Sequence, residues 1–444
     1  MSKIYDLPLT YRILRSAVLR AFRFYYGEII VTGIENIPTN NGGYIFAPNH
    51  RNALMDALAV AYITPKNIST SFLARSDIFK NKNVAKFMRF VKIMPAFRMR
   101  DGFDNLGKNN DVFEECAELL EANHALCIMP EGNQEIDHNV RPLVKGIFRV
   151  AFSAQLQNNG KNPIQIVPVG IDYGDIFNFG KHLIINIGKP INVSDYSQSY
   201  SENPPKATND IKVELKKRLE KLILHIDSDK NYDTILSTIY YCQLNLLKDN
   251  NLEASTLAKY QTRKLIADKL CEIEKTNPET IEKLSKLTAN YKAKLEEHRI
   301  KDRNVTNERL IKPILLKILF LTTTFPLFSV GLLTNFLAFF VPVWIRKMLN
   351  VEFEGFFSSI QFVIGILTFP VFYTLQVVLI CSLFSISFYY FPLFILLFLL
   401  IGNVAFKWYK VFKSTNASIR YMLLSENERN KLIKLQNEIL NLVK

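Results

Sequence analysis

Cysteine and histidine are scarce in this chain of 444 residues, and their positions argue against the sites that these residues usually build. The five cysteines show neither the paired spacing of a zinc site nor that of a disulfide framework. The six histidines are scattered, so we expect no metal site. We expect a protein of a reducing compartment, because the N-terminus also lacks the continuous apolar run of a secretory signal.

Acidic residues are outnumbered by basic ones, 41 to 55, which leaves a formal net charge of +14. Such a balance favours anionic partners, namely nucleic acid, an acidic membrane surface or phosphorylated metabolites. No nucleic-acid recognition motif is present, and basic residues cluster beside apolar segments. We therefore expect membrane lipids, and not nucleic acid, as partners. The oligomeric state is left open.

Charged side chains are missing altogether from two long segments, Ile318–Ile345 and Gly355–Phe406. Because an apolar helix needs about 20 residues to cross a bilayer, the second segment is long enough for two crossings, about 358–381 and 387–406. The first holds either one tilted crossing or a re-entrant hairpin, about 318–345, broken near Pro326. A buried core of a large soluble domain is the less favoured alternative.

The basic residues that flank these segments favour the hairpin. They lie on one side of the membrane only if the first segment returns to the side it left, as the positive-inside rule requires. We therefore predict a membrane domain over residues 313–410 with its flanks in the cytoplasm. The flanking residues are Lys312, Lys317, Arg346, Lys347, Lys407, Lys410 and Lys413.

The N-terminal residues 1–27 have the pattern of an amphipathic helix. On a helical wheel four arginines share one arc, and apolar side chains occupy the opposite face. This pattern is typical of a helix that lies in an anionic membrane interface, although a helix packed on its own domain shows it too. Given the apolar segments further on, we favour the interface. The arginines are Arg12, Arg15, Arg20 and Arg23.

Residues 28–204 alternate between strand-like and helix-like runs, which predicts an α/β domain with a mostly parallel sheet flanked by helices. Residues 205–312 are instead rich in Lys, Glu, Leu and Ile, and predict a charged helical region with four amphipathic helices. Residues 411–444 predict a cytoplasmic helical tail, whose last helix opens at Ser425 with Glu428 as a capping pair. The expected strands are 28–31, 43–47, 125–129, 165–169 and 183–187, and the expected helices are 54–62, 82–90, 111–122 and 145–157.

A histidine and an aspartate follow the strand expected at 43–47. His50 leaves the strand end, and Asp56 arrives where the next helix begins. Such a pair suits a general base and the carboxylate that orients it. Five residues separate them, so the link must begin as a loop, with Asn52 as the expected N-cap. In isolation, a histidine at a strand end is more often only structural.

Two further segments contain groups that bind anions. Arg98 and Arg100 stand beside a turn, and planar guanidinium groups bind phosphate bidentately. The turn at Glu131-Gly132 follows another strand, and Lys145 begins the next helix, where anions are favoured. Taken alone, the first segment is also explained by a solvated pair of arginines, and the second by an ordinary turn after a strand.

Taken in order, these motifs resemble the glycerolipid acyltransferase family, which contains the glycerol-3-phosphate and 1-acylglycerol-3-phosphate acyltransferases. The resemblance covers about residues 28–195. It rests on four segments in sequence. They are Asn49-His50 with Asp56, Phe97-x-x-Arg100, Pro130-Glu131-Gly132 and Ile166–Val169.

The resemblance implies that His50 deprotonates an acceptor hydroxyl while Asp56 holds the imidazole. The alkoxide then attacks the thioester of acyl-CoA or acyl-carrier protein, with no other cofactor and no metal. Arg100 matches the family's phosphate-binding arginine, and Glu131 and Gly132 match its acceptor site. Pro168, next to Val167, is expected to line the acyl or acceptor side.

Two departures from the family pattern matter. The family usually has four residues between its histidine and aspartate, and commonly follows Glu-Gly with Thr and Arg. Here five residues intervene, and Asn133 and Gln134 stand after Glu-Gly. We therefore add Arg98, Asn133 and Lys145 to the expected phosphate-binding residues. Arg141 is a further candidate for that task.

The sequence thus favours an integral membrane enzyme of phospholipid synthesis, with 1-acylglycerol-3-phosphate as acceptor and a catalytic domain that faces the cytoplasm. Glycerol-3-phosphate, dihydroxyacetone phosphate and a lyso-aminolipid are alternative acceptors. A membrane-anchored lipid-binding protein is the alternative without chemistry. A transporter is disfavoured, because the apolar block contains no charged side chain to mark a substrate path.

Overall fold

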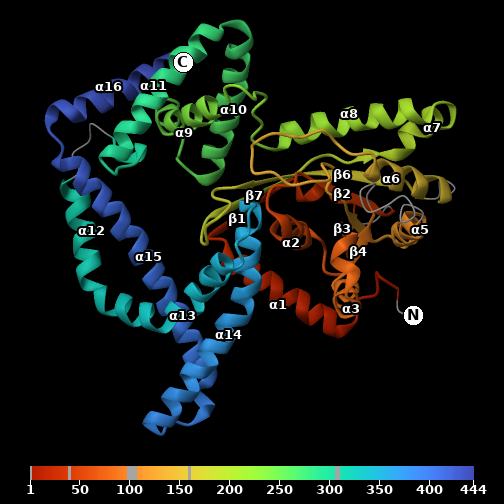
Figure 1. Ribbon diagram of the computed structural model, residues 1–444, viewed down its shortest axis with the longest axis horizontal. Coiled ribbons are helices and arrows are strands. Elements are labelled where there is room, and N and C mark those ends of the chain that lie inside the picture. Colours follow the sequence, from red (N-terminus) through yellow and green to blue (C-terminus); the bar gives the residue numbers. More distant parts are fainter. Residues whose placement is uncertain (1–2, 39–41, 98–107, 159–161, 306–310) are drawn as a thin grey trace. The chain divides into compact units, whose positions relative to one another are not determined.

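The computed structural model describes residues 3–38, 42–97, 108–158, 162–305 and 311–444 (Figure 1). The chain divides into two compact units. Unit 1 contains Met1–His225 together with Val351–Ser359, and unit 2 contains Ile226–Asn350 together with Ile360–Lys444. The two units are described separately below.

Unit 1 is built around a sheet with the strand order β1-β7-β6-β2-β5-β3-β4. The short strand β8 pairs with the first two residues of β6. β6 runs antiparallel to β7 and β8, whereas the other neighbours are parallel. The expected mostly parallel sheet is therefore confirmed. The strands are β1 (Glu28–Thr32), β2 (Tyr44–Pro48), β3 (Thr70–Arg75), β4 (Ile93–Ala96), β5 (Ala125–Cys127), β6 (Gln165–Tyr173), β7 (His182–Ile187) and β8 (Ile191–Asn192).

Helices cover both faces of this sheet, so its central strands are mostly apolar and buried. β2 is buried at every position. One face packs against α5, α6 and α8, and the other carries α1 and α2 (Figure 1). The helices of unit 1 are α1 (Leu9–Tyr25), α2 (Ala53–Ile63), α3 (Lys82–Phe90), α5 (Lys108–Glu121), α6 (Gly146–Gln157), α7 (Ser197–Glu202) and α8 (Pro204–Leu222).

Helix α8 belongs to the core of unit 1, although we expected the α/β domain to end at residue 204. Its apolar residues recur every four positions and form a single buried stripe against the sheet. The unit therefore continues to His225. The buried residues of the stripe are Ala207, Ile211, Leu215 and Leu219.

Helix α1 is packed on unit 1 and also exposes apolar side chains. Phe22 is fully buried, whereas Leu9 and Ile13 are 72% and 61% exposed. The Arg15 guanidinium donates to the carbonyl oxygens of Thr64 and Ile68, at 2.9 and 3.0 Å, beyond the end of α2. Arg15 thus fixes α1 to its own domain. Contact of the remaining exposed face with lipid stays a prediction.

Unit 2 is helical throughout its described residues. α9, α10, α11 and α16 pack against one another. The side chain of Ser425 accepts a hydrogen bond from the backbone of Glu428, so the predicted N-cap of the last helix is present. The helices are α9 (Tyr232–Asp249), α10 (Thr256–Thr276), α11 (Pro278–Glu297), α12 (Ile311–Thr323), α13 (Phe325–Met348), α14 (Phe357–Phe384, whose first turn lies in unit 1), α15 (Phe391–Leu423) and α16 (Glu426–Val443).

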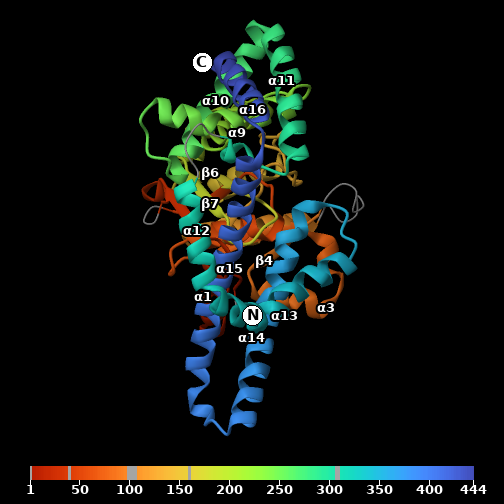
Figure 2. The ribbon, with the colours of Figure 1, turned by 90° about the vertical axis from the view of Figure 1, so that its left-hand side faces the viewer.

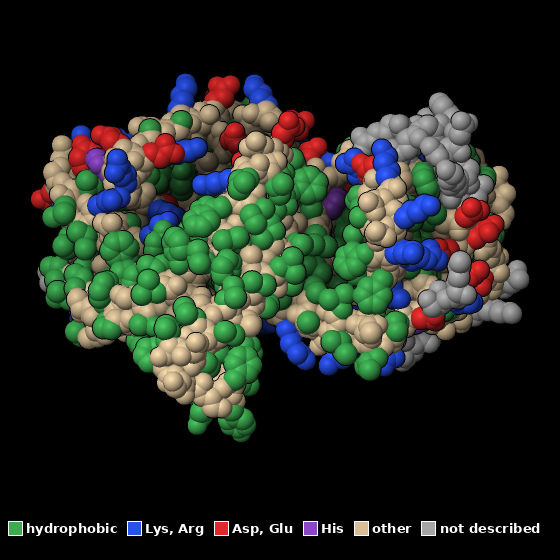
Figure 3. All heavy atoms as spheres, turned by 60° about the horizontal axis from the view of Figure 1, so that its bottom comes forward, with side chains coloured by type: hydrophobic (Ala, Val, Ile, Leu, Met, Phe, Trp, Pro, Cys, Tyr) green, Lys and Arg blue, Asp and Glu red, His purple; other side chains and the backbone are tan. Residues whose placement is uncertain are grey.

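Three helical segments are long and apolar enough to cross a membrane: Phe325–Met348, Glu354–Phe384 and Phe388–Leu423. Side chains along them are highly exposed, and hydrophobic groups cover this surface (Figure 3). So large an apolar surface is typical of a protein that lies in lipid. α14 and α15 are joined by the short 3-10 helix η7 (Phe388–Tyr390), and Tyr373 of α14 contacts Phe398 of α15 (Figure 2). The chain breaks between α12 and α13, near Pro326, and the re-entrant hairpin stays a prediction.

Candidate active site

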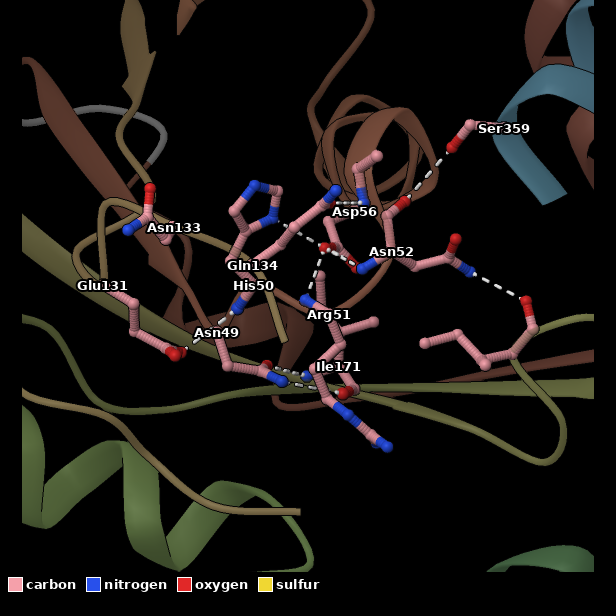
Figure 4. A network of polar contacts seen from close by, with 12 residues as sticks. Asn49, His50, Arg51, Asn52, Asp56, Glu131, Asn133, Gln134, Ile171 and Ser359 are labelled. Carbon is pink, nitrogen blue, oxygen red and sulfur yellow. Dashed lines mark hydrogen bonds and ion pairs between the residues drawn. The ribbon is translucent and has the colours of Figure 1, made fainter. Parts of the chain in front are cut away.

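The strand β2 delivers His50 to the edge of the sheet, and Asn49 fixes the point where the strand ends. The Asn49 side chain accepts from the backbone N–H of Ile171 at 2.7 Å and donates to the Ile171 carbonyl at 3.1 Å (Figure 4). It thereby continues the pairing of β2 with β6 by one step. The position of His50 is therefore set by the sheet itself.

His50 and Asp56 are in direct contact. The distance between His50 Nδ1 and Asp56 Oδ2 is 2.8 Å, and the aspartate is fully buried while 18% of the histidine side chain is exposed. Because a carboxylate only accepts hydrogen bonds, Nδ1 carries the proton of the neutral ring. Nε2 is then the nitrogen that can take up a proton, and it points away from Asp56 (Figure 4).

Asp56 is held by three donors besides the histidine. Its Oδ2 also accepts the backbone N–H groups of Arg51 and Asn52, at 2.8 and 2.7 Å. Its Oδ1 accepts the hydroxyl of Tyr173 at 2.6 Å. A buried carboxylate needs such partners, since an unpaired one is costly. The loop after His50 therefore wraps around the carboxylate that orients it.

Tyr173 was missed by the sequence analysis. It lies at the end of β6, and burial raises the pKa of its phenol well above the usual range, so the hydroxyl remains a donor. Alternation along β6 places Tyr173 on the same face of the sheet as Val169 and Ile171. The sequence analysis ended this strand at residue 169. With the true end at Tyr173, the alternation of side chains identifies Tyr173 as a residue of the site face.

The Glu131-Gly132 turn supports the histidine from the other side. Glu131 Oε1 accepts the backbone N–H of His50 at 3.1 Å, and Oε2 accepts Nε of Arg141 at 2.8 Å. Burial raises the pKa of Glu131, and Arg141 opposes that shift. The Arg141 guanidinium also donates to the Asn133 carbonyl and pairs with Glu135. Arg141 therefore holds this turn together, which argues against it as the phosphate ligand.

The additional residue between His50 and Asp56 is accommodated by a strained backbone. Ala53 has a φ of +41°, a conformation that L-residues rarely adopt. Its N–H donates to Oε1 of Gln134 at 2.7 Å. Asn52 occupies the predicted N-cap position of α2, but its side chain does not cap the helix, so that part of the prediction is wrong. The Asn52 amide instead donates to the Ile176 carbonyl at 3.4 Å.

Arg51 points away from the histidine and is buried. Its Nε donates to the Ile136 carbonyl at 3.0 Å, and Nη1 lies 3.2 Å from Nδ1 of His138. The same imidazole nitrogen lies 3.7 Å from a carboxylate oxygen of the buried Asp172. The sequence analysis did not identify this cluster, which connects the loop after β2 to the loop after Glu131.

The other predicted site residues lie as follows. Arg98 and Arg100 fall outside the described residues. Lys145 is exposed and precedes the first residue of α6, as expected. Pro168 is buried within β6, opposite Ala47 in the sheet register. Within the described residues, no group of three or more His, Cys, Asp or Glu side chains is placed to hold a metal ion.

Residues 28–172 match the protein family described as Acyltransferase. This part of unit 1 is therefore similar to acyltransferase domains. The match spans both loops described above, and it confirms the resemblance that the sequence motifs indicate. Three helical segments of the same chain are long and apolar enough to span a membrane.

Solved structures similar to this chain include the crystal structure of the 1-acyl-sn-glycerophosphate acyltransferase PlsC from Thermotoga maritima. The two chains are 20% identical, with a TM-score of 0.33, and the similarity covers 48% of this chain and 79% of PlsC. No curated protein matches the chain.

Proposed function

We propose that this chain is a membrane-bound acyltransferase that moves a fatty acyl group from a thioester to a hydroxyl of a glycerol-phosphate acceptor in phospholipid synthesis. The donor is acyl-CoA or acyl-carrier protein, and the favoured acceptor is 1-acylglycerol-3-phosphate. The contact between His50 and Asp56 is the observation that carries the proposal, because it fixes the ring in the tautomer that a general base needs.

In the proposed reaction, Nε2 of His50 accepts the proton of the acceptor hydroxyl while the alkoxide oxygen attacks the thioester carbonyl carbon. The negative charge of Asp56 stabilises the imidazolium that forms. Collapse of the tetrahedral intermediate breaks the C–S bond, and the imidazolium returns its proton to the leaving thiolate. The products are an ester and a thiol, and His50 is neutral again.

The acceptor phosphate is assigned to the basic residues that remain once Arg141 is excluded. Arg100 supplies a planar guanidinium for bidentate binding, and Arg98 and Lys145 add positive charge. Glu131 has a supporting task in this proposal, since its two oxygens are occupied by the His50 backbone and by Arg141. Gly132 has a φ of +72°, a conformation that glycine adopts without strain, and so allows the tight turn after Glu131.

The catalytic domain faces the cytoplasm in this proposal, because acyl-CoA and acyl-carrier protein are found there. The basic residues that flank the apolar segments agree with that orientation. The acceptor lipid then reaches the site from the cytoplasmic leaflet.

An acyl-transfer assay on the purified full-length protein tests the proposal. The acceptors are 1-acylglycerol-3-phosphate, glycerol-3-phosphate, dihydroxyacetone phosphate and a lyso-aminolipid, each combined with both donors. We expect transfer to a phosphate-bearing acceptor. Transfer to the lyso-aminolipid alone would contradict the assigned phosphate site, and binding of lipid without turnover would favour a lipid-binding protein.

A further inference from the structure

A segment far along the chain is part of the catalytic unit. Val351–Ser359 follows α13 and begins α14, yet it belongs to unit 1. Ser358 and Ser359 are only 1% and 6% exposed. The ring of Phe357 lies 6.3 Å from that of Phe177, in the loop between β6 and β7. The segment is therefore packed into the domain rather than laid on its surface.

Both serines are hydrogen-bonded to the loop that carries the histidine. Ser358 Oγ donates to Oδ1 of Asn52 at 2.5 Å. Ser359 Oγ donates to the Asn52 carbonyl at 3.4 Å, the bond drawn in Figure 4. Asn52 itself is 1% exposed. With its amide bound to Ile176, Asn52 is held from two directions.

Asn52 lies between the two groups that the proposed chemistry must align. Its backbone N–H and that of Arg51 both donate to Asp56 Oδ2, the oxygen that also binds His50. The next residue, Ala53, has the strained φ of +41° and is bound by Gln134. Strain of this kind persists only where the surroundings hold it.

We propose that Gln134 and Ser358 are positioning residues, which hold the loop at Asn52 and Ala53 so that His50 and Asp56 meet in reactive geometry. This inference rests on the proposed function. It also connects the two departures from the family pattern. The additional residue creates the strained turn, and Gln134, where the family commonly has arginine, binds that turn. The segment Val351–Ser359, which ends in the first turn of α14, supplies the second support.

Two substitutions in the full-length protein test the role. Gln134→Ala and Ser358→Ala each remove one hydrogen bond to the loop without touching the histidine or the aspartate. We expect kcat to fall about 10- to 100-fold, since a misplacement of about 1 Å costs up to about 100-fold. The KM values of donor and acceptor should stay near those of the wild type. The matched control is Ser201→Ala, an exposed serine of α7 whose hydroxyl donates to the Ser197 carbonyl of its own helix, and its kcat should be unchanged.

A rescue experiment separates positioning from general destabilisation. Glycine adopts a positive φ without strain, so Ala53→Gly should restore most of kcat in the Gln134→Ala protein. It should restore much less in the Ser358→Ala protein, whose lost bond is to Asn52. Equal rescue of both variants, or none of either, would overturn the assignment, as would unchanged kcat in both single variants.

Cross-linking tests the docking without relying on activity. Cysteines replace Asn52 and Ser358 in the full-length protein, and a disulfide between these two buried positions is sought by peptide mass spectrometry without reduction. A linked peptide pair is expected for positions 52 and 358, and none for the control pair 52 and 201, because Ser201 lies on α7, which packs with α8 on the other face of the sheet. Absence of the 52–358 link would refute the docking. A wild-type protein that transfers no acyl group would refute the proposed function instead, whatever the cross-link shows.

Discussion

Replacement of Asp56 by asparagine removes one negative charge from the site and leaves its shape intact. The two oxygens have different surroundings. Oδ2 accepts three N–H groups, from the His50 ring and from the backbone of Arg51 and Asn52, whereas Oδ1 meets only the hydroxyl of Tyr173. An amide fits with its oxygen toward the three N–H groups and its NH₂ toward Tyr173, because a phenol hydroxyl accepts as well as donates.

The expected decrease in kcat follows from the loss of the negative charge alone. A hydrogen bond to a charged group contributes about 1.5–3 kcal/mol. If that amount of imidazolium stabilisation disappears from the transition state, kcat falls about 10- to 150-fold. Removal of the base in His50→Ala should reduce kcat by about 10²- to 10⁴-fold. Asp56→Asn should therefore be the less impaired of the two variants.

The assay measures kcat and both KM values together with thermal unfolding. We expect Asp56→Asn to unfold near the wild-type temperature. Tyr173→Phe serves as the comparison, because it leaves Asp56 Oδ1 buried without a donor, which costs about 1–3 kcal/mol of stability. A kcat for Asp56→Asn equal to that of the wild type would refute the reasoning. So would a variant that is unfolded while Tyr173→Phe is stable.

Three further predictions concern other parts of the chain. Arg100→Lys keeps the charge and loses the bidentate fork, so the acceptor KM should rise with the donor KM little changed; equal effects on both would indicate a structural role. Burial raises the pKa of Asp302 from 3.8 to about 6, so unit 2 should lose stability as the pH rises from about 4 to 6. Asp302→Asn should remove this pH-dependent loss of stability, which is about 3 kcal/mol at neutral pH. Chemical unfolding at pH 4 and pH 7 measures the difference, and an unchanged pH dependence in the variant contradicts the assignment. A cysteine at Asn350 should be labelled only from the cytoplasmic face and one at Ser387 only from outside; labelling of position 350 from outside would show that 318–345 spans the membrane.

Of the five strands predicted from sequence, β2, β5, β6 and β7 are buried almost throughout, whereas β1 is only partly buried. β2 is a continuous apolar run, and β6 contains one from Ile166 to Ile171, as a sheet covered on both faces requires. β3 was missed because its sequence begins with Thr-Ser and ends with arginine. β4 is short and contains Pro95. The boundary at residue 204 was misplaced because charged residues dominate α8, while its narrow apolar stripe faces the core.

The histidine and aspartate of the candidate site were recognised because their signal is local. The spacing of His50 and Asp56, between a strand and a helix, is visible in ten residues of sequence. Ser358 meets Asn52 across 306 positions, and nothing in either segment indicates the other. Tyr173 depends on the true length of β6. Residues that support a site through such long-range bonds leave no periodic pattern, and only the folded chain reveals them.

The proposal that His50 acts as the base of an acyl transfer is tested most directly by one comparison. Purified full-length wild-type and His50→Ala proteins are given labelled acyl-CoA and 1-acylglycerol-3-phosphate, and the labelled diacyl product is counted. We expect steady turnover by the wild type and a rate at least about 100-fold lower for His50→Ala, with both proteins folded and in the membrane fraction. Turnover by His50→Ala close to that of the wild type would contradict the account.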